Sequence, residues 1–340
     1  MKLISINYEI QQIPLSTPFV TALRRVENVE FVRVYIYTKK DFAIGEAPAT
    51  KAITGEDIQS IKNSVLMMKT TLLDLEVQEA LEELHNADIK SSAKAALDMA
   101  LVTLLAKQRG QNLSEYFGIK DFSPVYTDVT ISFNEVRQML EDAQKALKNK
   151  QHILKVKVAN DVEHAVEVVR KIGSEVHGAE ILVDANQAWS LEESLYFIEK
   201  TKNLDLALIE QPVVAEDTDS LKVVTNSSQV PILADEAVFT LKDVQNLIAS
   251  KSADMINIKL MKCGGVTEAI KILTYAREKG VMCMLGSMLE GPYSINIALY
   301  LAFAYRDVVK FVDLDSPLLY KELPSELDFI YDGCKISLKK

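Results

Sequence analysis

The sequence predicts an α/β fold, a modified (β/α)8 TIM barrel with an α+β N-terminal capping domain that the C-terminal tail completes. Three observations predict this fold. Eight short apolar runs recur from residue 125 onward. The charged residues that end five successive runs are 24 to 27 residues apart, which is the length of a strand, a helix and two loops. The segments between the runs space their apolar residues at three and four, as amphipathic helices do.

Residues 1 to 122 are predicted to form the capping domain. Apolar and polar residues alternate from Ile4 to Ile10 and again in VEFVRVYIY, which predicts two strands, and DFAIGEAP continues the sheet. Helical patterns follow at residues 56 to 73 and in KSSAKAALDMALVTLLAKQ. Three strands followed by helices indicate an α+β unit.

Residues 123 to 315 are predicted to form the barrel. Its eight strands, in chain order, are VYTDVTIS, HILKVKV, AEILVDAN, LALIEQP, VPILADEA, DMINIKL, VMCMLGS and VVKFVDLD. In such a barrel the active site lies at the C-terminal ends of the strands. The tail, residues 316 to 340, lacks the pattern of another barrel unit, and we expect it to pack back on the N-terminal domain.

Composition and charge exclude several classes of protein. With 48% hydrophobic and 25% charged residues, the chain has the composition of a soluble globular protein, and it has no apolar run long enough to span a membrane. The net charge of −10 disfavours a nucleic-acid partner.

The N-terminus has no apolar signal-peptide core, which favours a cytoplasmic location. We expect a small-molecule substrate; a homo-oligomer is compatible with the sequence, which does not fix the oligomeric state.

Three carboxylates, Asp184, Glu210 and Asp235, end three successive predicted strands. On a barrel they converge, and they repel one another unless a cation lies between them. Ligands that are all oxygen favour a hard cation, and Mg2+ fits better than zinc. A helix N-cap explains one such residue easily, but not three at consecutive strand ends. The sequence therefore predicts one Mg2+ per subunit.

Lys155 and Lys157 lie on the same face of the second predicted strand. A solvated face of an edge strand is the ordinary explanation of such a pair. However, Lys259 ends the sixth strand and would face Lys157 across the barrel, while a dication and Lys155 would lower the pKa of Lys157 toward that of a base. Two bases on opposite sides of one carbon, beside a metal that grips a carboxylate, predict racemisation or epimerisation through an enediolate.

These residues resemble the enolase superfamily, muconate-lactonising subgroup. The resemblance covers the whole chain and includes NIKLMKCGG around Lys259 and the phrases GEAPAT and AALDMAL. It implies a lysine base with Mg2+, with Lys155 tuning Lys157 and helping to hold the substrate carboxylate. Asn186, Gln211 and Glu236 also follow the pattern, and we interpret them as groups that orient the metal ligands.

Within the subgroup, VDLDSP resembles the dipeptide epimerases, whose D-x-D motif holds the substrate ammonium group. The motif falls on Asp313 and Asp315. Strand eight lies opposite strand four, so a substrate whose carboxylate is at the metal would extend toward it. A solvated acidic turn is the alternative.

Three further residues are predicted to border the substrate. TPFVTALRRV is similar to the capping loop of the Ala-Glu epimerases, in which an arginine binds the glutamate side chain; Arg24 matches that position, although Arg24 and Arg25 could equally form a solvated pair. GSMLE resembles the seventh-strand segment of the family, and Ser287 and Met288 in it border the substrate. Thr130, in the first strand, completes the predicted substrate site.

The resemblance implies an isomerase that inverts the α-carbon of the C-terminal residue of a dipeptide, with L-Ala-D/L-Glu as the leading substrate and a role in turnover of cell-wall peptides by analogy. A dipeptide epimerase with an apolar or cationic preference is one alternative. An N-acylamino acid racemase, an o-succinylbenzoate synthase or a muconate cycloisomerase could use the same site, but their substrates carry no free ammonium group. A ligand-binding barrel without catalysis would not need both lysines.

Overall fold

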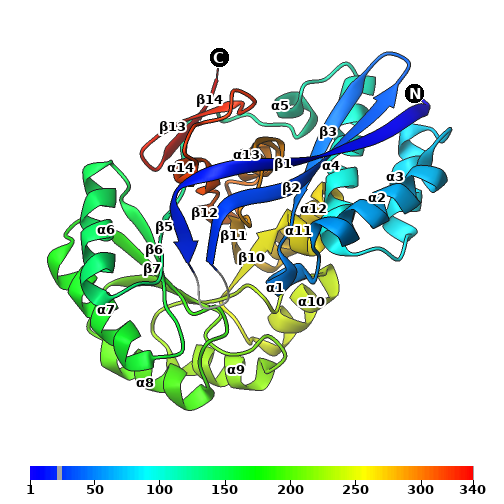
Figure 1. The fold of residues 1–340 in the computed structure, drawn as a ribbon. Coiled ribbons are helices and arrows are strands. Elements are labelled where there is room, and N and C mark those ends of the chain that lie inside the picture. Colours follow the sequence, from blue (N-terminus) through cyan, green and yellow to red (C-terminus); the bar gives the residue numbers. More distant parts are fainter. Residues whose placement is uncertain (21–24, 340) are drawn as a thin grey trace.

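The structure, a computed structural model, describes residues 1–20 and 25–339. Within these residues, a parallel sheet of eight strands curves into a nearly closed barrel with helices on its outside (Figure 1). The predicted fold class is confirmed. The barrel strands follow one another around the sheet in chain order: β5 (Val129–Ile131), β6 (Ile153–Lys157), β7 (Glu180–Asp184), β8 (Leu206–Glu210), β9 (Ile232–Ala234), β10 (Met255–Lys259), β11 (Met282–Gly286) and β12 (Val309–Asp313).

The first and last barrel strands meet just before β5. Thr127 forms a parallel bridge with Val312, and the amide of Asp128 donates to the carbonyl of Val312 at 2.9 Å. The predicted first strand, VYTDVTIS, is therefore divided. Its first two residues form β4 (Val125–Tyr126), which pairs antiparallel with a strand from the C-terminal tail because that strand offers it hydrogen-bond partners outside the barrel.

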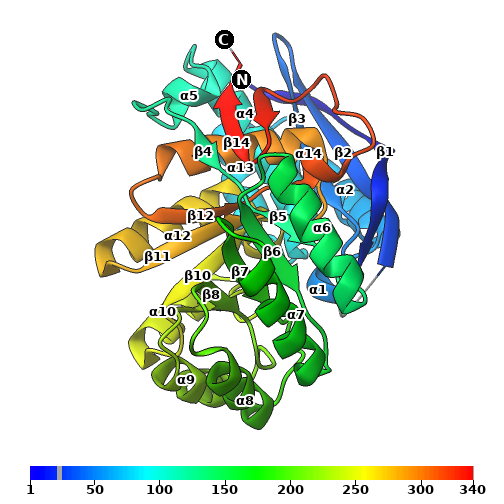
Figure 2. The ribbon, with the colours of Figure 1, turned by 90° about the vertical axis from the view of Figure 1, so that its left-hand side faces the viewer.

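The helices that follow the strands surround the barrel (Figure 2). Several of them begin at a residue whose side chain accepts hydrogen bonds from the first turn, such as Asp161, Ser190 and Thr240. These helices are α6 (Val136–Lys148), α7 (Val162–Glu175), α8 (Leu191–Thr201), α9 (Thr218–Ser227), α10 (Leu241–Ser250), α11 (Leu260–Cys263), α12 (Val266–Lys279) and α13 (Pro292–Ala304).

The barrel interior is an apolar layer to which six strands contribute one side chain each. Its members are Leu182, Leu208, Leu233, Met255, Met284 and Phe311. Because side chains alternate along a strand, the residue two positions after each member also points into the barrel. Asp184, Glu210 and Asp235 are the residues that follow Leu182, Leu208 and Leu233 in this way. The apolar layer thus forms the floor beneath a polar layer at the C-terminal ends of the strands.

The N-terminal region is an antiparallel sheet, in the order β1 (Leu3–Val20), β2 (Arg25–Thr38) and β3 (Phe42–Pro48), followed by helices as predicted. The helices are α1 (Lys51–Thr54), α2 (Ile58–Leu72), α3 (Val77–Asn86), α4 (Ser91–Gln108) and α5 (Leu113–Tyr116). Helix α4 packs against β3 so closely that a Cβ at Gly45 would lie 1.8 Å from the carbonyl oxygen of Ala96. On the barrel side, Asp98 of α4 accepts hydrogen bonds from the first amides of α12.

The long hairpin of β1 and β2 extends toward the barrel mouth (Figure 1). The amide of Val20 donates to Ser132 Oγ at 3.3 Å, and the amide of Phe133 donates to the carbonyl of Val20 at 3.2 Å. These bonds attach the end of β1 to the residues that follow β5. The N-terminal region thereby covers part of the mouth.

The C-terminal tail contacts both parts of the molecule. It forms α14 (Ser316–Leu319) and a hairpin of β13 (Phe329–Asp332) and β14 (Lys335–Leu338). Tyr320 bridges to Leu15 of β1, whereas Asn296 of α13 donates to the carbonyl of Glu326 at 2.7 Å. The predicted division of the chain, residues 1–122 with 316–340 and residues 123–315, stays a prediction. No helix among the described residues has the length and apolar character needed to cross a membrane.

Candidate active site

The three carboxylates predicted to bind the metal lie side by side in the polar layer of the barrel. Asp184 ends β7, Glu210 ends β8 next to it, and Asp235 follows β9. All three side chains are buried. We refer to Asp184, Glu210 and Asp235 as the strand-end carboxylates.

Amines from opposite sides of the barrel engage the strand-end carboxylates. Lys157 Nζ lies 2.5 Å from Asp184 Oδ2, and Lys259 Nζ lies 2.6 Å from Asp235 Oδ2. Strand β6, which carries Lys157, and strand β10, which carries Lys259, are four positions apart in the barrel sheet. The two amines therefore approach the mouth of the barrel from opposite sides.

Lys155 lies one layer deeper than Lys157 and is fully buried. Its amine lies 2.6 Å from Asp313 Oδ2, 2.7 Å from Glu210 Oε2 and 3.3 Å from Asp184 Oδ2. Both lysines of the K-x-K pattern thus point into the barrel, where carboxylates balance their charges. The explanation as a solvated edge strand is wrong, because β6 pairs on one side with β5 and on the other with β7.

The electrostatics of this layer are set by competition between burial and neighbouring charge. Burial opposes the charged form of Lys155, but the nearby carboxylates, Asp313 foremost, outweigh it and raise the pKa of Lys155 well above its usual value. Burial likewise opposes ionisation of Asp235, yet Lys259 and Lys262 hold the pKa of that carboxyl well below its usual range. For Glu210, burial and then the charge of Asp184 raise the pKa to about 7.

Asn186, Gln211 and Glu236 lie around the strand-end carboxylates. Gln211 Oε1 accepts from the amides of Asp235 at 2.9 Å and Ala237 at 3.2 Å, and the amide of Asn186 donates to Asp184 Oδ1 at 2.9 Å. Asn186 and Gln211 have positive φ angles of 45° and 37°, a region that asparagine enters readily and glutamine rarely. Asn186 Oδ1 and Glu236 Oε2 are buried and have no hydrogen-bond partner among the described residues.

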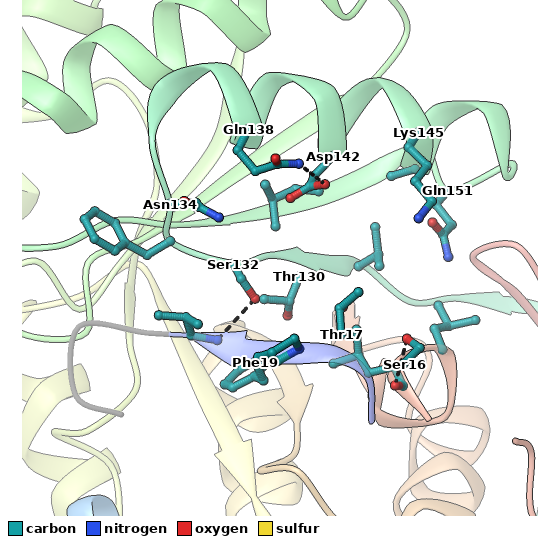
Figure 3. Close-up of a pocket in the computed structure, with 18 of the residues that line it drawn as sticks. Ser16, Thr17, Phe19, Thr130, Ser132, Asn134, Gln138, Asp142, Lys145 and Gln151 are labelled. Carbon is teal, nitrogen blue, oxygen red and sulfur yellow. Dashed lines mark hydrogen bonds between the residues drawn. The ribbon is translucent and has the colours of Figure 1, made fainter. Parts of the chain in front are cut away.

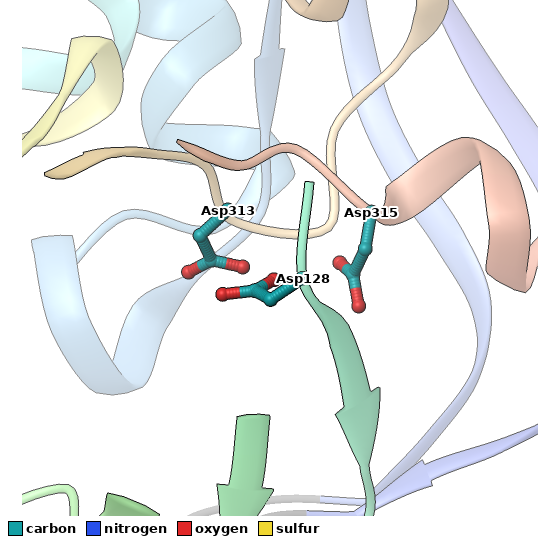
Figure 4. A group of neighbouring side chains, drawn as sticks. All are labelled: Asp128, Asp313 and Asp315. Atoms are coloured by element: carbon teal, nitrogen blue, oxygen red, sulfur yellow. The ribbon is translucent and has the colours of Figure 1, made fainter. Parts of the chain in front are cut away.

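A second acidic group lies on the far side of the barrel, at the end of β12. Asp313 Oδ2 pairs with Lys155, and Asp315 Oδ2 accepts from the amide of Thr130 at 2.7 Å. Burial and then the charge of Asp313 raise the pKa of Asp315 to about 6. Asp128 lies between them (Figure 4) and was not anticipated from the sequence. We refer to Asp128, Asp313 and Asp315 as the closure carboxylates, because they lie where the first and last barrel strands meet.

One cavity brings most of the predicted residues together. Its lining residues are Phe19, Ala52, Ile53, Thr130, Lys157, Asn186, Asp235, Glu236, Lys259, Ser287, Met288, Leu289, Asp313 and Asp315. Phe19, Ala52 and Ile53 come from the N-terminal region, which therefore closes the cavity over the barrel. Lys155, Asp184, Glu210 and Gln211 are fully buried and do not line it. Arg24 lies outside the described residues.

Ser287 and Met288 shape the cavity after β11. The amide of Ser287 donates to the carbonyl of Asp313 at 2.9 Å, and the amide of Met288 donates to Glu290 Oε1 at 2.8 Å. At the end of β11, a Cβ on Gly286 would lie 3.1 Å from Lys259 Cε and 2.7 Å from Asn257 Oδ1. Glycine at this position therefore leaves room for the Lys259 side chain.

A larger hollow adjoins the cavity outside the barrel, between the end of β1, β5 and α6 (Figure 3). It shares Phe19 and Thr130 with the cavity. Within it, the side chain of Gln138 donates to Asp142 at 3.1 Å. Apart from Thr130, none of the predicted site residues that the structure describes lines this hollow.

The fold and this layer of lysines and carboxylates match known proteins. The family model described as "Enolase C-terminal domain-like" matches residues 138–336, more than half of the chain. The chain belongs to this family. The resemblance to the enolase superfamily is thereby confirmed.

Several relatives of this enolase-family chain are named as epimerases that act on dipeptides. The chain is 57% identical over 338 residues to the L-amino acid-D/L-Glu epimerase of Sulfurimonas denitrificans, with 99% of each chain covered. It is similar to the substrate-liganded structure of the L-Ala-D/L-Glu epimerase from Bacillus subtilis (TM-score 0.93, 35% identity, 100% and 97% covered). It is also similar to the dipeptide epimerase from Enterococcus faecalis V583 complexed with Mg and L-Leu-L-Tyr (TM-score 0.92, 28% identity, 100% and 98% covered).

Three side chains of this enolase-family site were missed by sequence reasoning. Asn257 Nδ2 donates to Glu210 Oε1 at 2.8 Å, and Lys262 Nζ lies 2.5 Å from Asp235 Oδ1. Asn257 lies two residues before Lys259, so the alternation that linked Lys155 to Lys157 could have found it. Asp128 lies two residues before Thr130 in the predicted first strand, so the same alternation could have found it. Lys262 lies in the α11 turn and had no such signal.

Proposed function

We propose that this protein is a Mg2+-dependent dipeptide epimerase that inverts the α-carbon of the C-terminal residue by a two-base 1,1-proton transfer. L-Ala-D/L-Glu is the leading substrate, supported by the named activity of the 57% identical relative. The observation that carries the proposal is the pair of amines, Lys157 and Lys259, which reach one cavity from strands four positions apart. Removal and return of a proton on opposite faces of a carbon needs such a pair.

The strand-end carboxylates would hold the Mg2+. Their donor atoms are all carboxylate oxygens, the ligands that Mg2+ prefers. The buried oxygens of Asn186 and Glu236 without a described partner lie beside them and favour a further positive charge at this place. When bound, Mg2+ supplies positive charge next to the substrate carboxylate, which makes the adjacent α C–H group more acidic.

The lysines perform the proton transfer. Lys157 Nζ removes the α-proton from one face of the substrate, and Lys259 Nζ delivers a proton to the other face; for the opposite epimer the roles exchange. Lys157 and Lys259 pair with Asp184 and Asp235, and an ion held by these carboxylates would leave both amines available to the substrate. Lys155, whose pKa is raised, stays protonated and helps to hold the substrate carboxylate.

The remaining predicted residues bind the dipeptide. Asp313 and Asp315 accept hydrogen bonds from the substrate ammonium group, and both line the cavity. Thr130, Ser287 and Met288 border the substrate, and Arg24 binds the side-chain carboxylate of its C-terminal residue. Gln211 and Asn186 fix the strand-end carboxylates through the amide hydrogen bonds described above, and Glu236 accepts from Asn186 Nδ2 at 3.3 Å.

Deuterium exchange tests the two-base proposal. In deuterated water with Mg2+, Lys259→Ala should exchange the α-hydrogen of one epimer of Ala-Glu but interconvert the epimers about 100- to 10,000-fold more slowly than wild type. Lys157→Ala should show the same loss but exchange the other epimer, because the remaining lysine faces the other side. Lys222→Ala, which removes an exposed lysine on α9, is the matched control. Loss of exchange with both epimers in both variants would remove the assignment.

The same assay separates the proposal from its alternatives. A ligand-binding barrel would bind dipeptides without exchanging any α-hydrogen. An N-acylamino acid racemase would exchange N-acetyl-glutamate faster than Ala-Glu, whereas we expect the free dipeptide to be the better substrate. A panel of dipeptides with acidic, apolar and cationic C-terminal residues, followed by mass shift, determines the side-chain preference.

A further inference from the structure

The closure carboxylates form a compact group whose members come from distant parts of the chain. One oxygen of each lies within 4.8 Å of one oxygen of the other two. All three residues are buried. Asp128 is held by its backbone, which donates to Val312 of the last barrel strand. Figure 4 shows the carboxylate of Asp128 directed toward Asp313, with Asp315 on its other side.

Asp128 differs from its neighbours because both of its carboxylate oxygens are buried without a hydrogen-bond donor among the described residues. Asp313 has Lys155, and Asp315 has the amide of Thr130. Lys155 cannot balance the whole group, since it also pairs with Glu210 and Asp184. Among the described residues, the three closure carboxylates therefore share one amine and one backbone amide, and neither donates to Asp128.

Such an arrangement is costly unless a ligand completes it. A buried polar group without a partner loses its hydration and gains nothing in return. Burial, and then the charge of Asp313, raise the pKa of Asp128 well above its usual range. Asp313 and Asp315 line the cavity and Asp128 does not, so a cationic group of a ligand would reach Asp128 through its contact with these two neighbours.

We propose that Asp128 is the third acceptor for the substrate's α-ammonium group and makes the site selective for primary ammonium groups. The inference rests on the proposed function and deepens it. One oxygen of each closure carboxylate lies at most 4.8 Å from the other two. For any three atoms with this spacing there is a point within about 2.8 Å of all three, and a nitrogen at that point would be at a normal N–H···O distance from each oxygen. A primary ammonium has three N–H donors, one for each closure carboxylate. A secondary ammonium has two, and an N-acyl amide has one and no charge.

A divalent cation is the rival occupant of the closure carboxylates. The amine of Lys155 lies 2.6 Å from Asp313 Oδ2 and 2.7 Å from Glu210 Oε2, so its repulsion of a doubly charged ion applies to both groups of carboxylates and does not distinguish them. The two groups differ in the amines that line the cavity: Lys157 and Lys259 line it and pair with the strand-end carboxylates Asp184 and Asp235, whereas the closure carboxylates pair with no described lysine that lines it. We therefore assign the metal to the strand-end carboxylates and the ammonium to the closure carboxylates.

Kinetics of Asp128→Asn with Mg2+ present test the inference. Loss of one charge-assisted hydrogen bond should raise KM for L-Ala-L-Glu about 10- to 100-fold and change kcat much less. Wild type should use N-methyl-L-Ala-L-Glu at least about tenfold less efficiently than L-Ala-L-Glu, and Asp128→Asn should discriminate less between them. Asp219→Asn, on the exposed first turn of α9, makes the same charge change elsewhere and is the matched control.

Thermal unfolding separates ligand binding from a structural role. If Asp128 serves the ligand, Asp128→Asn should raise the Tm of the ligand-free protein, because it removes a buried carboxyl group whose ionisation burial and the charge of Asp313 oppose. A structural role predicts a lower Tm. The inference would be overturned if Asp128→Asn left both KM and the discrimination against the N-methyl substrate unchanged. It would also be overturned if the variant lost its activation by Mg2+ and showed no change in KM.

Three further outcomes also decide between the inference and its alternatives. If Asp128→Asn does not fold, the wild-type protein alone tests the inference. A site with two acceptors would tolerate the methyl group of N-methyl-L-Ala-L-Glu, whereas a site with three acceptors would use this substrate less efficiently than L-Ala-L-Glu. A wild-type protein that exchanges no dipeptide α-hydrogen would overturn the proposed function and this inference together. An active wild type whose Asp128→Asn variant behaves as the control overturns the inference alone.

Discussion

Two groups of three carboxylates lie at the mouth of the same barrel, and they differ in what neutralises them. Lys157, Lys259 and Lys262 pair with the strand-end carboxylates, and Asn257 donates to Glu210. The closure carboxylates have one backbone amide donor and the amine of Lys155, which also pairs with Glu210 of the strand-end group. The number of carboxylates therefore does not identify a metal site. The amines and amides around each group must also be compared, because they determine how much positive charge the carboxylates can still accept from a ligand.

The largest difference between the two groups should appear when one carboxylate of each is neutralised. Asp184→Asn should lower kcat at least about 1,000-fold, because the variant loses a ligand of the ion that acidifies the substrate. It should also lose the rise in Tm that Mg2+ causes in wild type. Asp313→Asn should keep that Mg2+ response. The measurements are exchange rates and melting curves at increasing Mg2+.

The opposite pattern would reverse the two assignments. If Asp313→Asn abolished the Mg2+ response of the Tm and Asp184→Asn kept it, the closure carboxylates would be the metal site. Asp219→Asn again controls for the loss of one negative charge.

A smaller effect should show that side-chain recognition is independent of both groups. Arg24→Met should lower kcat/KM for L-Ala-L-Glu about 10- to 100-fold, because a charge-assisted pair with the glutamate carboxylate is lost. With L-Ala-L-Leu the change should be less than about threefold, since no carboxylate is present. Arg25→Met is the control. Equal losses with both dipeptides would count against Arg24.

The smallest effect should come from pH. Asp315 has a pKa raised to about 6 by burial and then by the charge of Asp313, and it binds an ammonium group only when ionised. Binding is therefore present above pH 6 and is lost as the pH falls, so kcat/KM should drop about tenfold per unit below that value. In Asp315→Asn this step should be absent from the pH profile. A step that persists in the variant would belong to another group.

For stability the sign of the Asp315 effect is reversed. Because its pKa in the folded protein is above the usual value, the folded state binds more protons than the unfolded state between pH 3.8 and about 6. Ionised Asp315 therefore costs stability, and its cost appears as the pH rises through that window. The group is kept at a cost to the fold, which agrees with a role in binding.

Much of the site could be predicted because its residues repeat with the barrel unit. Asp184, Glu210 and Asp235 each follow an apolar residue of the barrel floor by two positions, and the strand period places them on one level. The same period put Lys155 and Lys157 on one face. The prediction of VYTDVTIS as one strand was wrong in its first half, since β4 pairs with β14 of the tail, more than 200 residues later in the chain.

The sequence by itself determined which strand ends carry carboxylates and amines, and from the order of strands which of them are opposed. Only the tertiary structure decided how their charges are shared. Closure of the barrel between β12 and the residues before β5 brings Asp128 beside Asp313 and Asp315, and it leaves Lys155 between the two acidic groups. The reason is physical: period and propensity act over a few residues, whereas the environment of a buried charge depends on every element that packs around it.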